Sequence, residues 1–298
     1  MNYSRDLVGY GATPPDAQWP DGARVAVQFV INYEEGGENS VLHGDKGSEA
    51  FLSEMVGAQS HVGARAIAME SLYEYGSRAG FWRLHRLFSE RNVPVTVFGV
   101  AMAMERNPAA VAAMLKADWE IATHGYRWID YQYLPEDVER EHIAKAIDIH
   151  TAVTGSRPRG WYQGRTSPNT ARLVVEEGGF TYDADSYADD VPYYDARYGR
   201  PQLIVPYSLD ANDMKFVAMN GFEDGEPFFR YLRDTFDQLH LEGNRMMSIG
   251  LHGRIAGRPA RAAAVARFLD HVLARDDAWI ARRIDIADHW LKVHPYAD

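Results

Sequence analysis

Seven short apolar runs alternate with helical segments along nearly the whole chain, and this alternation limits the possible folds more than any other feature. The first run, residues 24–32, is an almost continuous series of valine, alanine, phenylalanine and isoleucine. Such a run is typical of a parallel strand that is covered on both faces. The other runs are residues 95–100, 119–123, 160–163, 180–183, 203–205 and 246–251. We therefore expect an α/β fold with a parallel sheet.

Helical segments are predicted between most of these runs. Asn107 and Ser167 each precede a proline, which is the pattern of an N-cap followed by a proline in the first turn. The predicted helices are residues 108–117, 135–154, 168–177, 226–241 and 259–273. Since no polar linker interrupts the alternation, we expect residues 1–298 to form a single domain. Its simplest architecture is a distorted (β/α) barrel of about seven parallel strands.

Residues 33–80 break the alternation. The segment contains eight glycines and has no long periodic pattern. It follows the carboxyl end of the first predicted strand, where parallel barrels hold their active sites. Because connections of this length are usually functional, we expect this insertion to form a wall of the pocket or to pack against a neighbouring subunit.

Charge and composition exclude several classes of partner. The chain has 42 acidic and 31 basic side chains and a net charge of −11, so no positive field favours nucleic acid or an anionic membrane. It has no cysteine, which excludes disulfides, thiol nucleophiles and thiolate metal sites. The first 20 residues lack the basic start and apolar run of a secretion signal. We expect a cytoplasmic protein with no membrane or nucleic-acid partner.

Four polar clusters directly follow predicted strands. They are residues 32–35, 124–128, 164–166 and 252–254. In a parallel barrel the carboxyl ends of the strands meet at one mouth, so these clusters should converge on one pocket. Glu34 and Glu35 supply paired carboxylates, one of which could serve as a general base for water. His124 and His252 are the strongest acid or base candidates among the histidines, because each follows an apolar strand.

These clusters resemble the motifs of the polysaccharide deacetylase family, which has the NodB-homology fold. In that family a Thr-Phe-Asp-Asp motif ends the first strand and a His-x-x-x-His motif ends the third. An arginine-containing motif follows, and a Leu-His motif lies near the C-terminus. The corresponding parts of this chain are residues 32–35, residues 124–128, Arg165, and Leu251 with His252. Asp183 and Asp185 lie near the place of a further motif, between the last two. The resemblance covers nearly the whole chain and implies the same barrel.

The resemblance also bears on metal binding. Metal-dependent members hold their ion with the second aspartate of the first motif and with both histidines of the second. Those places fall on Glu35, His124 and Trp128 in this chain. A catalytic zinc ion usually has three protein ligands, and an indole ring offers no lone pair. We therefore expect no metal ligands and no cofactor.

The loss of a ligand, together with strings such as NYEEGGE, LHGDKGSEAFLSE and SIGLHGRIAGRPAR, resembles the metal-independent allantoinase branch of the family. This resemblance implies a hydrolase that opens a cyclic amide C–N bond, converting allantoin to allantoate in purine and ureide catabolism. It also implies a homotetramer.

Three alternatives stay open from the sequence. The first is a cyclic-imide hydrolase, a close relative of the same branch. The second is a metal-dependent deacetylase of N-acetylated sugars, with a third ligand from Asp130 or from residues 33–80. The third is a non-catalytic member that only binds a ureide. Zinc content distinguishes the second alternative, and binding without turnover distinguishes the third.

Catalytic roles follow from the resemblance residue by residue. Glu34 holds the place of the catalytic base, Glu35 that of a metal ligand, and His252 that of the general acid. Without a metal, Glu35 is free to act as the base or to orient His124, so the choice between the two glutamates stays open. The expected catalytic residues are therefore Glu34, Glu35, His124 and His252.

Substrate-binding residues are expected around a small polar ring. Allantoin is dense with amide donors and acceptors, so its pocket should combine polar groups with an aromatic wall. Arg165 and Arg254 are expected to donate hydrogen bonds to a carbonyl that becomes an oxyanion, and Asp185 to anchor Arg165 or a substrate amide. The expected substrate-binding residues are Asn32, Tyr33, Tyr126, Trp128, Trp161, Arg165, Asp185 and Arg254.

Overall fold

Strand β1 (Val25–Tyr33) lies at the centre of the molecule. The computed structural model describes residues 5–218 and 221–297, and every residue of β1 in it is buried. The strand pairs in parallel with β2 (Thr96–Gly99) on one edge and with β8 (Arg245–His252) on the other. Both faces of β1 are covered, as its continuous apolar sequence predicts.

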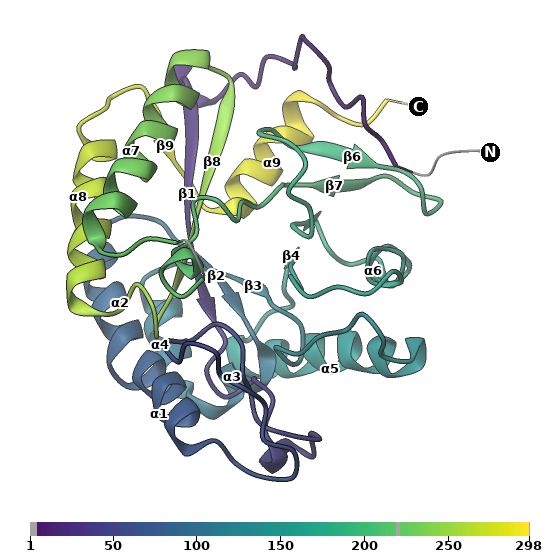
Figure 1. Ribbon diagram of the computed structural model, residues 1–298. Helices are drawn as coiled ribbons and strands as arrows, with labels where there is room; N and C mark the ends of the chain where they lie inside the picture. The colour runs from purple at the N-terminus through teal and green to yellow at the C-terminus, as the bar shows by residue number, and fades with distance from the viewer. Residues whose placement is uncertain (1–4, 219–220, 298) are drawn as a thin grey trace.

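The strands form a curled sheet, an open half-barrel (Figure 1). Its order is β6-β7-β5-β4-β3-β2-β1-β8, and β9 also pairs with β1. The remaining strands are β3 (Glu120–Thr123), β4 (Gly160–Trp161), β5 (Tyr182–Asp183), β6 (Tyr193–Asp195), β7 (Gln202–Ile204) and β9 (Ala278–Ile280). Each of the seven predicted runs overlaps a strand, which confirms the parallel α/β barrel class. The sequence did not predict β6, which is antiparallel to β7, or the short β9.

Helices surround this sheet. The five predicted ones are α4 (Pro108–Lys116), α5 (Glu136–Thr154), α6 (Thr170–Glu177), α7 (Gly225–Glu242) and α8 (Pro259–Leu273). Asn107 caps α4 by accepting a hydrogen bond from the backbone of Ala110, as its position before a proline suggested. The helices without a prediction are α1 (Ile67–Tyr75), α2 (Phe81–Ser89), α3 (Ala101–Arg106) and α9 (Arg283–Val293). No helix in the described ranges has the length and hydropathy needed to cross a membrane.

The segment 33–80 is more ordered than its sequence suggested. It contains the short helix η2 (Val41–His43), helix α1, and a single π turn, η3 (Gly76–Gly80), that joins α1 to α2. Glycines on both sides of helix α1 interrupt the helical pattern, so the sequence did not predict this helix. Two of these glycines, Gly76 and Gly80, lie where the backbone makes close contacts. A Cβ added to Gly80 would lie 1.8 Å from the carbonyl oxygen of Gly253, so only glycine fits there. This contact ties the segment to the chain that follows β8.

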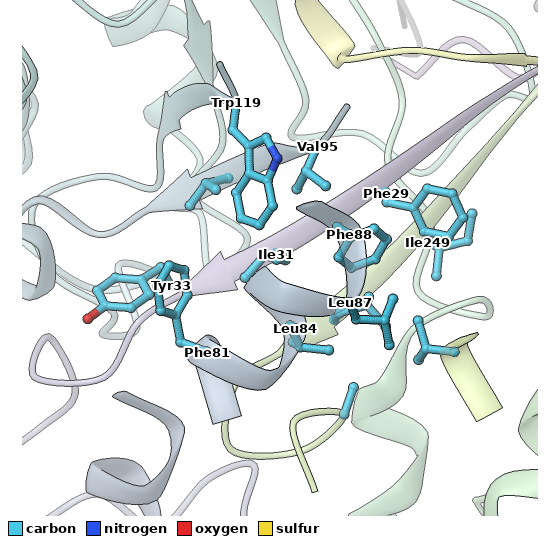
Figure 2. Close-up of a cluster of buried hydrophobic side chains, with 14 of the residues drawn as sticks. Phe29, Ile31, Tyr33, Phe81, Leu84, Leu87, Phe88, Val95, Trp119 and Ile249 are labelled. Carbon is cyan, nitrogen blue, oxygen red and sulfur yellow. The ribbon is translucent and has the colours of Figure 1, made fainter. Parts of the chain in front are cut away.

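A hydrophobic core fills the space between β1, β8 and the helices α2, α7 and α8 (Figure 2). The ring of Phe29 lies 5.2 Å from that of Phe88 on α2 and 6.1 Å from that of Phe268 on α8. Ile31 and Ile249 are fully buried in the same cluster. This packing fixes β1 and β8 relative to each other, and thus the residues at their carboxyl ends.

Arg283 connects the two ends of the open sheet. Its side chain is fully buried, and its guanidinium donates hydrogen bonds to Ser248 on β8 at 2.9 Å and to the carbonyl of Pro206, after β7, at 3.0 Å. It also bonds to Gln28 on β1 and to the carbonyl of Val205. Strands β7 and β8 are separated by the gap of the half-barrel, so this arginine closes the barrel below the site.

Candidate active site

A cavity of about 230 Å³ lies at the carboxyl ends of the strands. Six of the twelve predicted site residues line it: Asn32, Glu34, His124, Trp128, Arg165 and His252. The other six, Tyr33, Glu35, Tyr126, Trp161, Asp185 and Arg254, do not. Residues of the 33–80 segment, Phe51 and Leu52, form part of the wall. The structure therefore brings the predicted clusters together, but only half of their side chains face the cavity.

Strand alternation explains which residues of the first cluster face the cavity. Asn32 and Glu34 are two positions apart and lie on the inner side, whereas Tyr33 points to the opposite side. There the hydroxyl of Tyr33 lies 3.1 Å from Ser77 Oγ and accepts a hydrogen bond from Asn107 at 2.8 Å. Tyr33 therefore supports the core and is not part of the aromatic wall that the sequence suggested.

Glu34 is the charged centre of the cavity. Its Oε1 lies 3.3 Å from Nε2 of His124 and 3.3 Å from Nε2 of His252, and its Oε2 lies 2.7 Å from Nη2 of Arg254. Burial alone would raise the pKa of this carboxyl. The charges of Arg254 and His252 and the hydrogen bonds from both histidines outweigh burial, and they hold the pKa well below its usual range. Glu34 is therefore ionised.

His252 lies between two carboxylates. Its Nδ1 lies 2.5 Å from Oδ1 of Asp213, whose Oδ2 also accepts the backbone N–H of His252 at 2.6 Å. Burial opposes the charged imidazolium, but the charges of Asp213 and Glu34 overcome it and raise the pKa of His252 to about 9. His252 is therefore protonated at neutral pH, and its Nε2–H is directed at Glu34.

Asp213 is a site residue that the sequence did not reveal. It lies in the short helix η4 (Asp213–Phe216), in a stretch with no periodic pattern and no strand directly before it. Its carboxylate is fully buried and also accepts the backbone N–H of Ala256 at 2.8 Å. The bonds to His252 fix the position of its ring and keep a proton on its Nδ1.

Glu35 and Arg254 form a buried ion pair behind Glu34. Oε1 of Glu35 lies 3.4 Å from Nη1 of Arg254 and accepts its backbone N–H at 3.3 Å. A Cβ on Gly76 would lie 2.2 Å from the same oxygen, so the carboxylate fits against a bare backbone. Burial raises the pKa of Glu35, although Arg254 opposes this. Glu35 thus faces α1 and η3 rather than His124.

The guanidinium of Arg254 contacts other protein groups on all sides. Besides the two glutamates, its guanidinium lies 4.3 Å from the ring centre of Tyr73 and 5.2 Å from that of Trp128. It is 2% exposed, and its Nε donates to the carbonyl of Leu52. Arg254 is therefore not placed to donate to a substrate oxygen, contrary to the sequence prediction; instead it keeps Glu34 ionised.

Three further predicted residues support the cavity from outside. Trp161 donates through Nε1 to Asp185 at 3.0 Å, and Asp185 also accepts the backbone N–H of Gly164 at 2.7 Å. Asp185 therefore holds the loop after β4 and does not pair with Arg165. Tyr126 packs edge-on against His142 of α5, with ring centres 4.9 Å apart.

The aromatic wall is made largely of tyrosines that the sequence analysis missed. Tyr162, Tyr187 and Tyr207 line the cavity. The hydroxyls of Tyr162 and Tyr187 are 3.0 Å apart, and Asn32 donates to the hydroxyl of Tyr207 at 3.0 Å. Alternation along β4 was the available signal, because Trp161 packs outward and the next residue must face inward.

The donor set does not fit the metal site of a deacetylase. Trp128 occupies the third ligand position, and its indole packs against Phe51 with ring centres 5.8 Å apart. The carboxylate of Glu35, the expected oxygen ligand, is bound to Arg254. Within residues 5–218 and 221–297, no group of three or more histidine, cysteine, aspartate or glutamate side chains is arranged to hold a metal ion.

Comparisons with known proteins agree with this architecture. The polysaccharide deacetylase family model matches residues 64–182, a range that includes His124 and Arg165. A Schizosaccharomyces pombe protein, provisionally named a polysaccharide deacetylase, is 41% identical over 320 residues, covering 99% of each chain.

Two solved structures are similar over their whole length. The crystal structure of Puue allantoinase is 56% identical with a TM-score of 0.98, covering 100% of both chains. A Pseudomonas aeruginosa PAO1 structure, provisionally named a polysaccharide deacetylase, is 59% identical with a TM-score of 0.97, covering 99% of this chain and 100% of that one. With its fold, its motif positions and these relatives in agreement, the chain belongs to the polysaccharide deacetylase family.

Proposed function

We propose that this protein hydrolyses a C–N bond of a cyclic amide without a metal ion, and that its substrate is allantoin, which it converts to allantoate. The observation that carries the proposal is the pairing of an ionised Glu34 with a protonated His252 in a cavity where Trp128 replaces a metal ligand. The full-length similarity to Puue allantoinase supports the choice of substrate.

An acid and a base in contact account for the ring opening. Glu34 Oε1 takes a proton from water, whose oxygen attacks the ring carbonyl carbon. The C–N bond then breaks, the leaving nitrogen takes the proton from His252 Nε2, and the carboxylic acid that forms loses its proton to solvent. Because Oε1 and Nε2 are 3.3 Å apart, the proton on Glu34 returns to His252 and restores the resting pair. Asp213 stabilises the imidazolium before it donates its proton and after the proton from Glu34 restores it.

Arg165 supplies the positive charge for the attacked carbonyl. It lines the same cavity, and its Nη1 is buried without a hydrogen-bond partner. A preorganised cationic donor stabilises the oxyanion of the tetrahedral intermediate. The sequence suggested that Arg165 and Arg254 both donate to the oxyanion. Arg254 is bound to Glu34 and Glu35, so only Arg165 takes this role.

The size and lining of the cavity favour a small polar ring. Its volume of about 230 Å³ lies below the roughly 300–1,000 Å³ of pockets for drug-sized ligands. The amides of Asn32 and Asn212 and three tyrosine hydroxyls give the cavity a polar lining, in which Asn32 and Asn212 both donate to the hydroxyl of Tyr207. A sugar polymer requires a longer, open groove.

A substrate panel tests the proposed reaction. Racemic allantoin, hydantoin, succinimide and chitin oligosaccharides are incubated separately with purified protein, and ring opening or acetate release is followed. We expect the highest kcat/KM for allantoin. A higher value for succinimide would favour the cyclic-imide hydrolase, and acetate release would favour the deacetylase. Binding of allantoin with no turnover of any compound would indicate a non-catalytic ureide-binding member.

The pH dependence of turnover tests the role of Asp213. His252 must be protonated to act as the general acid. We therefore expect kcat/KM to stay constant through neutral pH and to fall as pH rises through about 9, the pKa of His252. In Asp213→Asn the carboxylate charge is lost while burial remains, so the pKa of His252 falls and the alkaline limb moves to lower pH.

The matched control is Asp210→Asn. Asp210 lies in the same segment but accepts hydrogen bonds from Ser208 and Tyr231 and does not contact His252. Its pH profile should keep the wild-type alkaline limb. An unchanged alkaline limb in Asp213→Asn would show that His252 is not the acid whose ionisation limits turnover.

A further inference from the structure

Arg165 differs from the other arginine at the site in having no anionic partner. Arg254 lies 2.7 Å from one glutamate and 3.4 Å from another. No ion pair to the guanidinium of Arg165 is present among residues 5–218 and 221–297, and its Nη1 is buried with no hydrogen-bond partner. A buried polar group without a partner destabilises the folded protein, and the cost is larger when the group is charged.

Aromatic stacking holds this guanidinium without using its donors. Its central carbon lies 5.3 Å from the ring centre of Phe51 and 5.2 Å from that of Trp128, and both rings line the cavity. Cation–π contacts stabilise the charge while the N–H groups stay available. The side chain is therefore positioned for a ligand rather than for the protein.

The other charged groups of the site pair with one another, and Arg165 lies outside these pairs. Glu34 is matched by Arg254 and His252, and His252 is matched in turn by Asp213. A guanidinium fork binds a carboxylate through two parallel hydrogen bonds, which is stronger than its binding to a neutral carbonyl. An anionic ligand would thus give this guanidinium the direct partner that it lacks among the described residues.

We propose that Arg165 is the carboxylate-recognition residue of this cavity, so that the site binds small ureido carboxylates more tightly than the matching neutral amides. This rests on the proposed ring opening only in the identity of the natural ligand. Hydrolysis of a cyclic amide turns the attacked carbonyl carbon into a carboxylate carbon. The oxyanion that Arg165 stabilises during attack thereby becomes the carboxylate that it retains, and the product inhibits the enzyme.

Two nearly isosteric probes test this selectivity by calorimetry. N-carbamoylglycine carries a carboxylate, and N-carbamoylglycinamide replaces it with a neutral amide. The wild-type protein should bind the acid at least about tenfold more tightly at low salt, the lower end for a hydrogen bond to a charged group. Added salt should reduce this preference, since ions screen the pair. The salt series needs no variant, so it also holds if a substitution disturbs folding.

Substitutions at Arg165 test whether this residue causes the preference for the acid over the amide. Arg165→Gln should abolish the preference for the acid while the neutral amide still binds, and Arg165→Lys should keep part of it because the charge remains. The matched control is Arg258→Gln, since Arg258 also stacks on an aromatic ring, that of Tyr75 at 3.6 Å, but lies outside the cavity. This control should keep the full preference.

The outcomes separate this inference from the proposed function. Equal binding of acid and amide by the wild type, or a preference that survives in Arg165→Gln, would overturn the role of Arg165 even if allantoin is hydrolysed. A preference for the acid that depends on Arg165, without opening of any cyclic amide, would support the carboxylate site and contradict the proposed reaction.

Discussion

Glu34→Gln is expected to lower kcat for allantoin opening by about 10²- to 10⁴-fold, the usual contribution of a positioned general base. The amide has the same shape but cannot accept a proton from water. It also removes one of the two carboxylates beside His252. Steady-state kinetics on the chelator-treated variant, with circular dichroism to confirm folding, measure the effect.

The matched control for this prediction is Glu35→Gln. The sequence left the choice between the two glutamates open, but only Glu34 lines the cavity. Glu35 is bound to Arg254 and packs against Gly76, so its amide variant should lose far less kcat than the Glu34 variant. Equal losses in the two variants would mean that the charge of the pair matters and that neither carboxylate alone is the base.

Arg254→Met is expected to lower the free energy of unfolding by about 3–5 kcal/mol, because it leaves Glu34 and Glu35 buried without their shared cation. Urea denaturation at pH 8 measures the loss. Both carboxyls then bind protons more readily in the folded protein than in the unfolded chain. Stability of the variant therefore falls as pH rises, and the loss should be smaller at pH 5 than at pH 8.

A second substitution tests the cause of this loss. In a Glu35→Gln background one of the two buried charges is already gone, so Arg254→Met should cost less there than in the wild type. A cost that is the same in both backgrounds would show that packing of the guanidinium against Tyr73 and Trp128, rather than its charge, dominates.

Much of the fold was predictable because helices cover both faces of a parallel sheet, and this burial leaves clear apolar patterns in the sequence. The continuous apolar run of β1 predicted a central buried strand, and prolines after Asn107 and Ser167 marked helix starts. Every residue of strands β6 and β9 is only partly buried, so their sequences carry less of the burial signal that marked the other strands. Helix α1 was hidden among glycines whose role is close backbone contact, at Gly76 and Gly80.

The site was predicted in position but only partly in detail. All four clusters lie at one end of the sheet, as parallel topology requires. Within each cluster, alternation of side chains decides which residue faces the cavity, so that Asn32 and Tyr162 lie inside while Tyr33 and Trp161 pack outside. This rule divides each strand end into two sets, but both faces of β1 are buried, so the sequence alone does not say which set faces the cavity.

Asp213 could not be predicted in the same way. It reaches His252 from an irregular segment 39 residues earlier in the chain, and no local pattern reports that long-range contact. Tyr187 and Tyr207 likewise come from loops whose course depends on tertiary packing, including the hydrogen bond between Tyr207 and Asn32. The place of these three residues at the site can therefore be recognised only in the folded structure.

The most direct test of the central claim is the rate of allantoin hydrolysis by chelator-dialysed protein, with the metal content determined on the same sample. Glu34, His252 and Asp213 provide the acid and the base within the protein, so we predict full turnover at negligible metal content. Activity that disappears on dialysis and returns in proportion to added zinc would contradict this account.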